Sequence, residues 1–557
     1  MESWLKPAPP HHEHAPPLYN ALPQTPVHTR SSTTDRYCVK YEDRQILLFR
    51  FADEMMPFFV GLIGTQVFLN CFLPPSDPAS VPPFRTGMFN RFIELLSCKE
   101  TTSYEEFVSF DPPTSPRPLL SFGLILLFQN QTISPHIPHL LVVNTSRATD
   151  RAPLGKFPFK LQPNCSVYAT ENKTKDDLDL SHVDFFIEMK SDTDPFVVKN
   201  PPKNEGRTSS ENPYPFLRSG RSREYLGQIT AYTSMILSTQ YRTHLFSVFI
   251  CKNYARLIRW DRGGAVVTQP IFYNTEPHLL DFLMRYNVAD RKVRGHDPTV
   301  GLPTDDEVTL AKAIIPEMKG VVSFLAVTIS DQQSSRRYII PSPKSRADIP
   351  VGRWTRSSFA LDTKEQRRVL LKDSWRVLLK DIEPEGELYR QLHKNGVCNI
   401  PSCLSAGDVS PDTHHQTQTH DVTKEVIDNS TCYKLTPHRH YRIVLGTVGR
   451  RLEEFKCTEE LVNAMYAALK GEMAIFLAVC VSNLARIIAH EAAYKNGILH
   501  RDISLGNILI ATDDELNRLD PYESKIQGGL LIDWDLSKII DPNDNPSTSR
   551  QFTRTVS

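Results

Sequence analysis

The segment ILHRDISLGNILI, residues 498–510, constrains this chain more than any other part of its sequence. It carries a carboxylate, Asp502, and a side-chain amide, Asn507, between apolar residues. Transfer of a phosphoryl group to a hydroxyl needs a carboxylate that accepts the hydroxyl proton and an oxygen ligand that holds magnesium beside it. The spacing H-R-D-x-x-x-x-N therefore predicts Asp502 as the base and Asn507 as a magnesium ligand, with Arg501 as a further catalytic residue.

A second apolar stretch, LLIDWDLS at residues 530–537, places another carboxylate at the end of a predicted strand. Asp533 takes the position of the magnesium-binding Asp of a D-F-G motif, with Trp534 in place of Phe and Asp535 in place of Gly. A chance loop with surface carboxylates is the alternative. We favour the magnesium site, because three matching parts follow one another in the order that the chemistry requires.

The lysine and the carboxylate that position the phosphates of a nucleotide are expected upstream. A kinase holds the α- and β-phosphates with a strand lysine, which a helix carboxylate orients. Lys372 lies in the strand-like VLLKDSW, and Glu385 opens a predicted helix in which Glu387 is the rival carboxylate. We prefer Glu385, because Tyr389, four residues later, would then face inward beside it. Either glutamate could instead be a solvated charge that favours the helix N-terminus.

The predicted phosphate loop contains a single glycine. Gly352 in VGRWTRSSFAL stands where kinases carry G-x-G-x-x-G, and the full motif is absent. Its backbone amide is still expected to approach phosphate. Gly352 therefore joins Lys372, Glu385, Asn507 and Asp533 as a predicted nucleotide-binding residue.

Taken together, these motifs resemble those of the fungal-type protein kinases, a family abundant in mushroom-forming fungi. The resemblance rests on LLKDSW, EGELYRQLHKNGV, HYRIVLGTVGRRLEEF, ILHRDISLGNILI and GLLIDWDLS, and it covers roughly residues 150–557. The upstream segment that begins QITAYTSMILSTQ resembles the region before the kinase domain in that family. The family implies a bilobal kinase fold, ATP and Mg²⁺ as cofactors, and transfer to Ser or Thr of a protein.

Three positions depart from the pattern of a typical kinase. Ser504 stands two residues after Asp502, where Ser/Thr kinases usually carry a lysine that touches the γ-phosphate. Asp535 produces a D-W-D motif that also resembles small-molecule kinases. Residues 471–486 lengthen the helix expected before the catalytic loop. They are either an inserted or mis-spliced segment or further turns of a buried helix.

The chain ends at Ser557, before the later helices of a kinase C-lobe. Those helices normally cover apolar surface under the catalytic loop, and leaving it exposed costs about 25 cal/mol per Å². We therefore expect a truncated C-lobe that has low stability or needs a protein partner to cover it. The leading function is a protein Ser/Thr kinase. The alternatives are a pseudokinase that acts as a binding scaffold and a small-molecule kinase.

Residues 163–228 suggest a second site of a different class, because they resemble nucleases of the PD-(D/E)xK type. Those enzymes bind magnesium through two acids, and a lysine steadies the attacked phosphate. Glu188, Lys190 and Gln228 match the later parts of the pattern, but Asn164 replaces the first acid, which should weaken metal binding. We expect a nuclease-like fold without activity and nucleic acid only as a less favoured partner. Surface charge is the alternative for Glu-x-Lys.

The length of the chain predicts about three to four domains, and the kinase and nuclease resemblances imply an α+β fold class. Lys+Arg and Asp+Glu are both 64 among 557 residues, so no overall basic field attracts nucleic acid or a membrane. The 10 cysteines form no CxxC pair, which favours reduced thiols in an intracellular protein of the cytoplasm or nucleus. No stretch is apolar over the length of a spanning helix.

The expected divisions are a disordered Pro/His-rich tail at 1–35, a mixed helical region at 36–150, a nuclease-like α/β region, similar to restriction endonucleases, at 151–300 and a kinase-like domain at 310–557.

Overall fold

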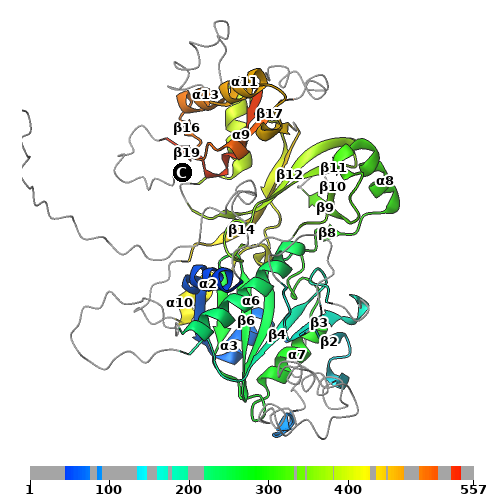
Figure 1. Cartoon of the computed structure of the whole chain (residues 1–557), viewed down its shortest axis with the longest axis vertical. Coiled ribbons are helices and arrows are strands. Elements are labelled where there is room, and N and C mark those ends of the chain that lie inside the picture. Colours follow the sequence, from blue (N-terminus) through cyan, green and yellow to red (C-terminus); the bar gives the residue numbers. More distant parts are fainter. Residues whose placement is uncertain are drawn as a thin grey trace, which may run out of the picture.

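In the computed structural model, two large sheets and then two small ones follow one another along the chain (Figure 1). The expected tail at 1–35, the segment 471–486 and the last residues, 541–557, lie outside the described residues. The structure describes residues 44–75, 84–90, 134–146, 148, 160–172, 178–197, 219–330, 335–344, 348–379, 382–426, 435–446, 449–469, 489–511 and 528–540.

The first sheet has seven strands in the order β1-β7-β6-β5-β4-β3-β2. Strands β2, β3 and β4 form an antiparallel meander, and β5 returns parallel to β4. A parallel return needs a crossover connection, and helix α6 provides it. The strands are β1 (Phe59–Ile63), β2 (Leu140–Asn144), β3 (Cys165–Ala169), β4 (Phe185–Lys190), β5 (Leu245–Cys251), β6 (Tyr254–Asp261) and β7 (Gly264–Thr268), and the helices are α2 (Arg44–Met55), α3 (Thr65–Phe72), α6 (Gly220–Thr239) and α7 (His278–Val288).

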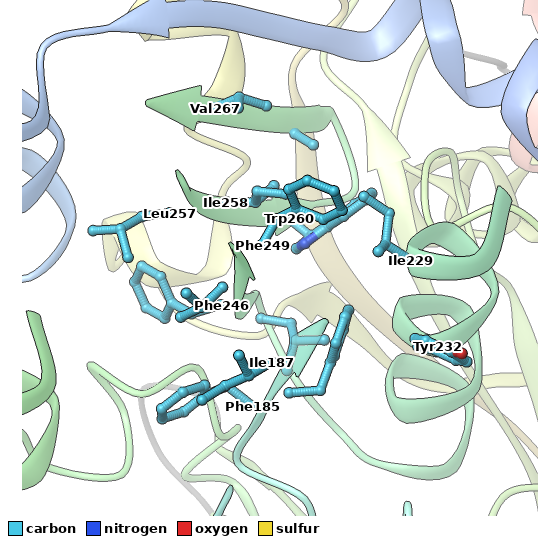
Figure 2. Close-up of a cluster of buried hydrophobic side chains, with 14 of the residues drawn as sticks. Phe185, Ile187, Ile229, Tyr232, Phe246, Phe249, Leu257, Ile258, Trp260 and Val267 are labelled. Atoms are coloured by element: carbon cyan, nitrogen blue, oxygen red, sulfur yellow. The ribbon is translucent and has the colours of Figure 1, made fainter. Parts of the chain in front are cut away.

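Helices cover both faces of the first sheet, which explains its nearly continuous apolar strands. Phe185 on β4 packs edge-to-face on Phe282 and Tyr286 of α7, whereas Phe186 packs on Tyr232 of α6. Neighbouring side chains of a strand point to opposite faces, so the two phenylalanines reach the two helix layers. Figure 2 shows the resulting core between α6 and the strands.

The sequence suggested only a mixed helical region at 36–150, and the structure joins the described parts of that region to the first sheet. Strands β1 and β2 are the two edges of the sheet, and α2 packs along α6. Gly227 brings α6 against the backbone of Leu48 in α2. Phe51 and Met55 of α2 are fully buried in the same core.

The second sheet is antiparallel, with the order β13-β14-β12-β11-β10-β9-β8. Strand β12 carries Lys372 near the middle of the sheet, and α9 follows it. The pattern EGELYRQLHKNG predicts a helix that Gly396 ends, and α9 stops at Lys394 with Gly396 at φ +69°. The elements are β8 (Val300–Gly301), α8 (Asp305–Ile314), β9 (Phe324–Ser330), β10 (Ser335–Pro341), β11 (Arg356–Asp362), β12 (Arg367–Val377), α9 (Glu385–Lys394), β13 (Cys403–Asp408), α10 (Thr419–Val426) and β14 (His438–Leu445).

Two small antiparallel sheets surround the catalytic loop. Strand β16 pairs with β19, and β17 pairs with both β15 and β18. In the region of the helix expected before the catalytic loop, the structure describes α11 and α13, and residues 470–488 lie outside the described part. The elements are β15 (Arg450–Arg451), α11 (Thr458–Leu469), α13 (Ala489–Lys495), β16 (Ile498–Leu499), β17 (Ile508–Ile510), β18 (Gly529–Leu531) and β19 (Lys538–Ile539).

The two sheets share a core. Trp354, from the loop between β10 and β11, is buried in the hydrophobic cluster of the first sheet. The connection between β13 and β14 carries α10, which packs on β1 and β7 (Figure 1). Asp261 of β6 accepts hydrogen bonds from the amides of Gln418 and Thr419 at 2.8 and 3.1 Å. The first sheet therefore holds the second sheet at two separate places.

A buried polar network crosses the same interface. Arg442 on β14 donates to Asp297, in the segment after α7, at 2.6 Å and to Asp373 on β12 at 2.7 Å. His440 donates to Asp373 at 2.8 Å, and its other ring nitrogen lies 3.1 Å from that of His415. Asp297, His415 and His440 are of metal-ligand types, but each already has a partner within the network.

Candidate active site

Lys372 and Glu385 form the buried ion pair that the sequence predicts. The Lys372 Nζ atom lies 2.8 Å from Glu385 Oε2, and the two residues are 5% and 2% exposed. The rival Glu387 points outward and pairs with the exposed Arg390. Burial raises the pKa of Glu385 by more than the charge of Lys372 lowers it. Glu385 is therefore the carboxylate that orients Lys372.

Two carboxylates after β18 meet the same lysine. Asp533 adopts a left-handed conformation, with φ +69°, and its carboxylate contacts Lys372 Nζ. Asp535 accepts a hydrogen bond from the same ammonium at 2.9 Å. Burial alone would raise the pKa of Asp533, but the charges of Lys372 and Arg353 hold it below its ordinary value. Glu385, Asp533 and Asp535 present oxygen atoms within 4.8 Å of one another, which is a donor set that fits Mg²⁺.

A buried histidine holds the catalytic loop. His500 Nε2 donates to the carbonyl oxygen of Ile532 at 3.0 Å, and its ring packs on Trp534 with centroids 4.5 Å apart. In a neutral ring the second nitrogen is an acceptor, and His500 Nδ1 accepts the Asp502 amide at 3.3 Å. Burial lowers the pKa of His500 to about 4, so the neutral ring persists near neutral pH. His500 therefore ties the start of the loop to the strand that precedes Asp533.

Asp502 and Asn507 lie together within that loop. Asn507 Nδ2 donates to the Asp502 carbonyl oxygen at 2.9 Å and lies 3.4 Å from its carboxylate. Because the amide nitrogen is used inside the loop, Asn507 Oδ1 is the atom that can hold a metal. The Ile532 amide donates to the Asn507 carbonyl oxygen at 2.9 Å, which links Asn507 to the chain just before Asp533. Arg501 lies in the same loop, with φ +71°.

The described geometry can be compared with known proteins. A family model described as fungal protein kinase matches residues 218–481 and 482–557, which is more than half of the chain. The chain belongs to the fungal protein kinase family. The matched region of this fungal protein kinase begins just before α6, so it includes part of the first sheet as well as the second. A kinase-like fold therefore carries the candidate site.

Other comparisons add little to the family assignment. A search of curated proteins returned no match. Among solved structures, the crystal structure of the BubR1 kinase domain is similar at 12% identity, with a TM-score of 0.23 over 44% of this chain. The chain spans 64% of the length of that kinase domain. Within the described parts of this fungal protein kinase, no helix has both the length and the apolar character needed to cross a membrane.

The loop between β10 and β11 holds the predicted phosphate-loop glycine of this fungal protein kinase. Gly352 lies there with φ +101°, but its amide donates to the carbonyl oxygen of Arg262, beyond β6, at 2.9 Å. This amide is therefore engaged with the first sheet and not with the nucleotide site. The next residue, Arg353, turns its side chain the other way and pairs with Asp535.

Sequence reasoning missed Arg353 and assigned no role to Asp535. Arg353 is buried among the predicted site residues. Burial lowers its pKa, whereas the negative charges of Asp533, Glu385 and Asp502 favour its charged form. Its only signal in the sequence is its place after Gly352, and an arginine beside a loop glycine is too common to stand out. Asp535 was visible as the replacement of a D-F-G glycine, but its contact with Lys372 depends on the folded chain.

The first sheet of this fungal protein kinase brings together the residues of the second predicted site. Asn164 precedes β3, Glu188 and Lys190 lie on β4, and Gln228 lies on α6. Lys190 Nζ is 2.6 Å from Glu188 Oε1 and 2.8 Å from Gln228 Oε1. Asn164 Oδ1 accepts the amide of Met189 at 2.9 Å. Surface charge is the wrong interpretation of this Glu-x-Lys, because both charged residues are buried.

Proposed function

We propose that this protein is a kinase that uses ATP and Mg²⁺ to phosphorylate serine or threonine of a protein. The observation that supports this most is that Lys372 contacts Glu385 and Asp533 at once. Such a lysine, bound by a helix carboxylate and next to the metal-binding Asp, is the arrangement in which a kinase holds nucleotide phosphates. Asp502 and Asn507 lie together on the catalytic loop, and a backbone hydrogen bond joins Asn507 to Ile532, just before Asp533.

The proposal gives each residue a role. Lys372 binds the α- and β-phosphates, and Glu385 keeps its ammonium group in place. Asn507 and Asp533 would hold Mg²⁺, which when bound neutralises charge on the phosphate oxygens. Asp502 accepts the proton of the substrate hydroxyl as that oxygen attacks the γ-phosphorus, and ADP leaves as the bond from the γ-phosphorus to the bridging oxygen breaks. Serine or threonine as the acceptor is inferred from the family, to which the matched residues assign the chain.

A small-molecule acceptor is the second candidate. Asp535 takes the place of the D-F-G glycine and binds Lys372 directly, at 2.9 Å. Ser504 stands where Ser/Thr kinases usually carry a lysine. Both positions differ from the pattern of Ser/Thr kinases next to the proposed base and metal ligands, so they bear on which acceptor is used.

A transfer assay separates these functions. The full chain would be incubated with radiolabelled ATP, Mg²⁺ and either general protein acceptors or a panel of small alcohols and amines. We expect label on protein, and none with Asp502→Asn. Label on small molecules alone would support the second candidate, and ATP binding without transfer would support a scaffold. A folded chain that does not bind ATP with Mg²⁺ would overturn the kinase proposal.

For the first sheet we propose a unit similar to restriction endonucleases that has lost cleavage activity. The antiparallel meander β2 to β4, the crossover α6 and the parallel β5 support this, because they set Glu188 and Lys190 at a strand end beside Gln228. Asn164 has no charge to share a divalent ion, and Lys190 is already paired.

This second proposal is tested with Mg²⁺ or Mn²⁺ and duplex DNA. We expect no cleavage by the natural chain and a gain in metal affinity for Asn164→Asp, which supplies the missing carboxylate. Cleavage by the natural chain that disappears in Lys190→Ala would show that the unit is an active nuclease.

A further inference from the structure

The loop between β10 and β11 is anchored to the first sheet. The Gly352 amide is bonded to the Arg262 carbonyl oxygen, and Arg262 Nη1 donates to the Pro350 carbonyl oxygen at 3.1 Å. The Arg262 guanidinium also stacks over Trp354, with Cζ 4.1 Å from the ring centroid. Backbone amides of a glycine-rich loop usually contact the phosphates. Here the glycine amide is not available for that contact.

The same loop instead directs one cationic side chain into the site. The Arg353 side chain is 7% exposed and pairs with Asp535. Its carbonyl oxygen accepts the amide of Trp375 on β12 at 2.7 Å, so its backbone is fixed to the strand that carries Lys372. A small pocket beside it is lined in part by Arg353, Glu385 and Asp535, together with Arg376 and Tyr441. The guanidinium is therefore the group that this loop presents to the carboxylates around Lys372.

Charge explains why an arginine can be buried there. The acidic cluster, Glu385, Asp533 and Asp535, brings three carboxyl groups together, and both Lys372 and Arg353 contact it. A divalent ion held by Asn507 and Asp533 would add positive charge to this cluster and reduce its need for the guanidinium. A guanidinium has planar paired donors that match phosphate oxygens, and a nucleotide entering with the ion offers those oxygens.

We propose that Arg353 is a phosphate-binding residue of the nucleotide site, which neutralises the acidic cluster while the site is empty and pairs with phosphate oxygens when a nucleoside triphosphate binds. The inference rests on the proposed ATP-binding function and deepens it. A side chain does in this protein what the amides of a glycine-rich loop do in other kinases. The first sheet, through Arg262, positions that side chain.

The test compares binding of three ligands to the full chain by titration calorimetry: ATP with Mg²⁺, adenosine, and Mn²⁺ alone. For Arg353→Ala we expect about 10- to 100-fold weaker ATP binding, the loss typical of a hydrogen bond to a charged group. Adenosine affinity should not change, because it has no phosphate. Mn²⁺ alone should bind more tightly, because a competing cation has been removed from the acidic cluster. Arg353→Lys should fall between the natural chain and Arg353→Ala.

Arg390→Ala is the matched control, since this arginine lies on the outer side of α9 with its side chain 65% exposed. It should leave all three affinities unchanged. Arg353→Gln retains the volume of the side chain and replaces Arg353→Ala if that variant does not fold. ATP binding equal to that of the natural chain, or equal losses for ATP and adenosine, would overturn this inference alone. A natural chain that binds no ATP would overturn the proposed function together with it.

Discussion

Arg442 Nη2 lies 2.6 Å from Asp297 Oδ2, and this buried ion pair joins the second sheet to the segment that follows α7. The same guanidinium donates to Asp373 at 2.7 Å, so one cation serves two buried carboxylates. Burial alone would raise the pKa of Asp297, but the charge of Arg442 holds it below its ordinary value. Removing the positive charge of Arg442 would therefore leave Asp297 and Asp373 without this partner and would weaken the contact between the two sheets.

Arg442→Gln should destabilise the chain by about 3–5 kcal/mol, because it leaves two buried carboxylates without their cation. The free energy of unfolding in urea is the measurement. Arg291→Gln is the control. Arg291 lies in the segment after α7, which also carries Asp297, but it forms an exposed pair with Glu171. It should change stability by less than about 1 kcal/mol. Equal effects of the two variants would contradict the importance of the buried pair.

Glu385→Gln should lower kcat/KM for phosphoryl transfer by about 100-fold, a loss typical for one group that stabilises charge in the transition state. The substitution retains the shape of the side chain but removes the charge that orients Lys372. Glu387→Gln changes the rival carboxylate two residues later, which pairs with Arg390 at the surface. Steady-state kinetics of both variants show which glutamate orients Lys372. Activity lost in Glu387→Gln and retained in Glu385→Gln would reverse our assignment.

The stability of the protein should fall as pH drops from 7.5 to 5, in part because of His438. Its Nδ1 donates to the Thr436 carbonyl oxygen at 2.9 Å, and its Nε2 has no hydrogen-bond partner among the described residues. Burial lowers the pKa of His438 to about 4, whereas an unfolded histidine titrates near its ordinary value of about 6.5. Over this range the unfolded state takes up the proton and the folded state does not, so stability decreases with falling pH.

The contribution of His438 amounts to about 2 kcal/mol between pH 7.5 and 5. His438→Asn retains a donor for Thr436 but does not titrate. The difference in unfolding free energy between the two pH values should therefore be smaller by about that amount in the variant. Identical pH dependence in the natural chain and His438→Asn would contradict the neutral, buried histidine.

Gly227→Ala should destabilise the first sheet and its helices by about 1–3 kcal/mol, the usual cost of forcing extra volume into a packed interior. A Cβ atom at this position would overlap the carbonyl oxygen of Leu48 in α2. Gly220→Ala is the control on the same helix, because a Cβ atom there meets nothing within 4 Å. Thermal melts should show a lower transition temperature for Gly227→Ala only. A stable Gly227→Ala variant would mean that α2 and α6 do not pack as closely as described.

Local spacing made much of the site predictable. Asp502 and Asn507 lie in one loop, and Gly396 stops α9 where the pattern of the helix ends. The family assignment follows from such short motifs, since chemistry restricts the residues within a few positions of one another. The sequence also grouped Glu188, Lys190 and Gln228, but the hydrogen bond between Lys190 and Gln228 became visible only in the folded chain.

The sequence by itself determined which side chains this protein has for phosphoryl transfer, and in what order. Only the tertiary structure decided that Glu385 and not Glu387 meets Lys372, since both glutamates open the same helix. It also decided that the Gly352 amide bonds to Arg262 while Arg353 enters the site. These choices depend on contacts between residues far apart in the chain, and local spacing does not specify which distant surface will cover a given side chain.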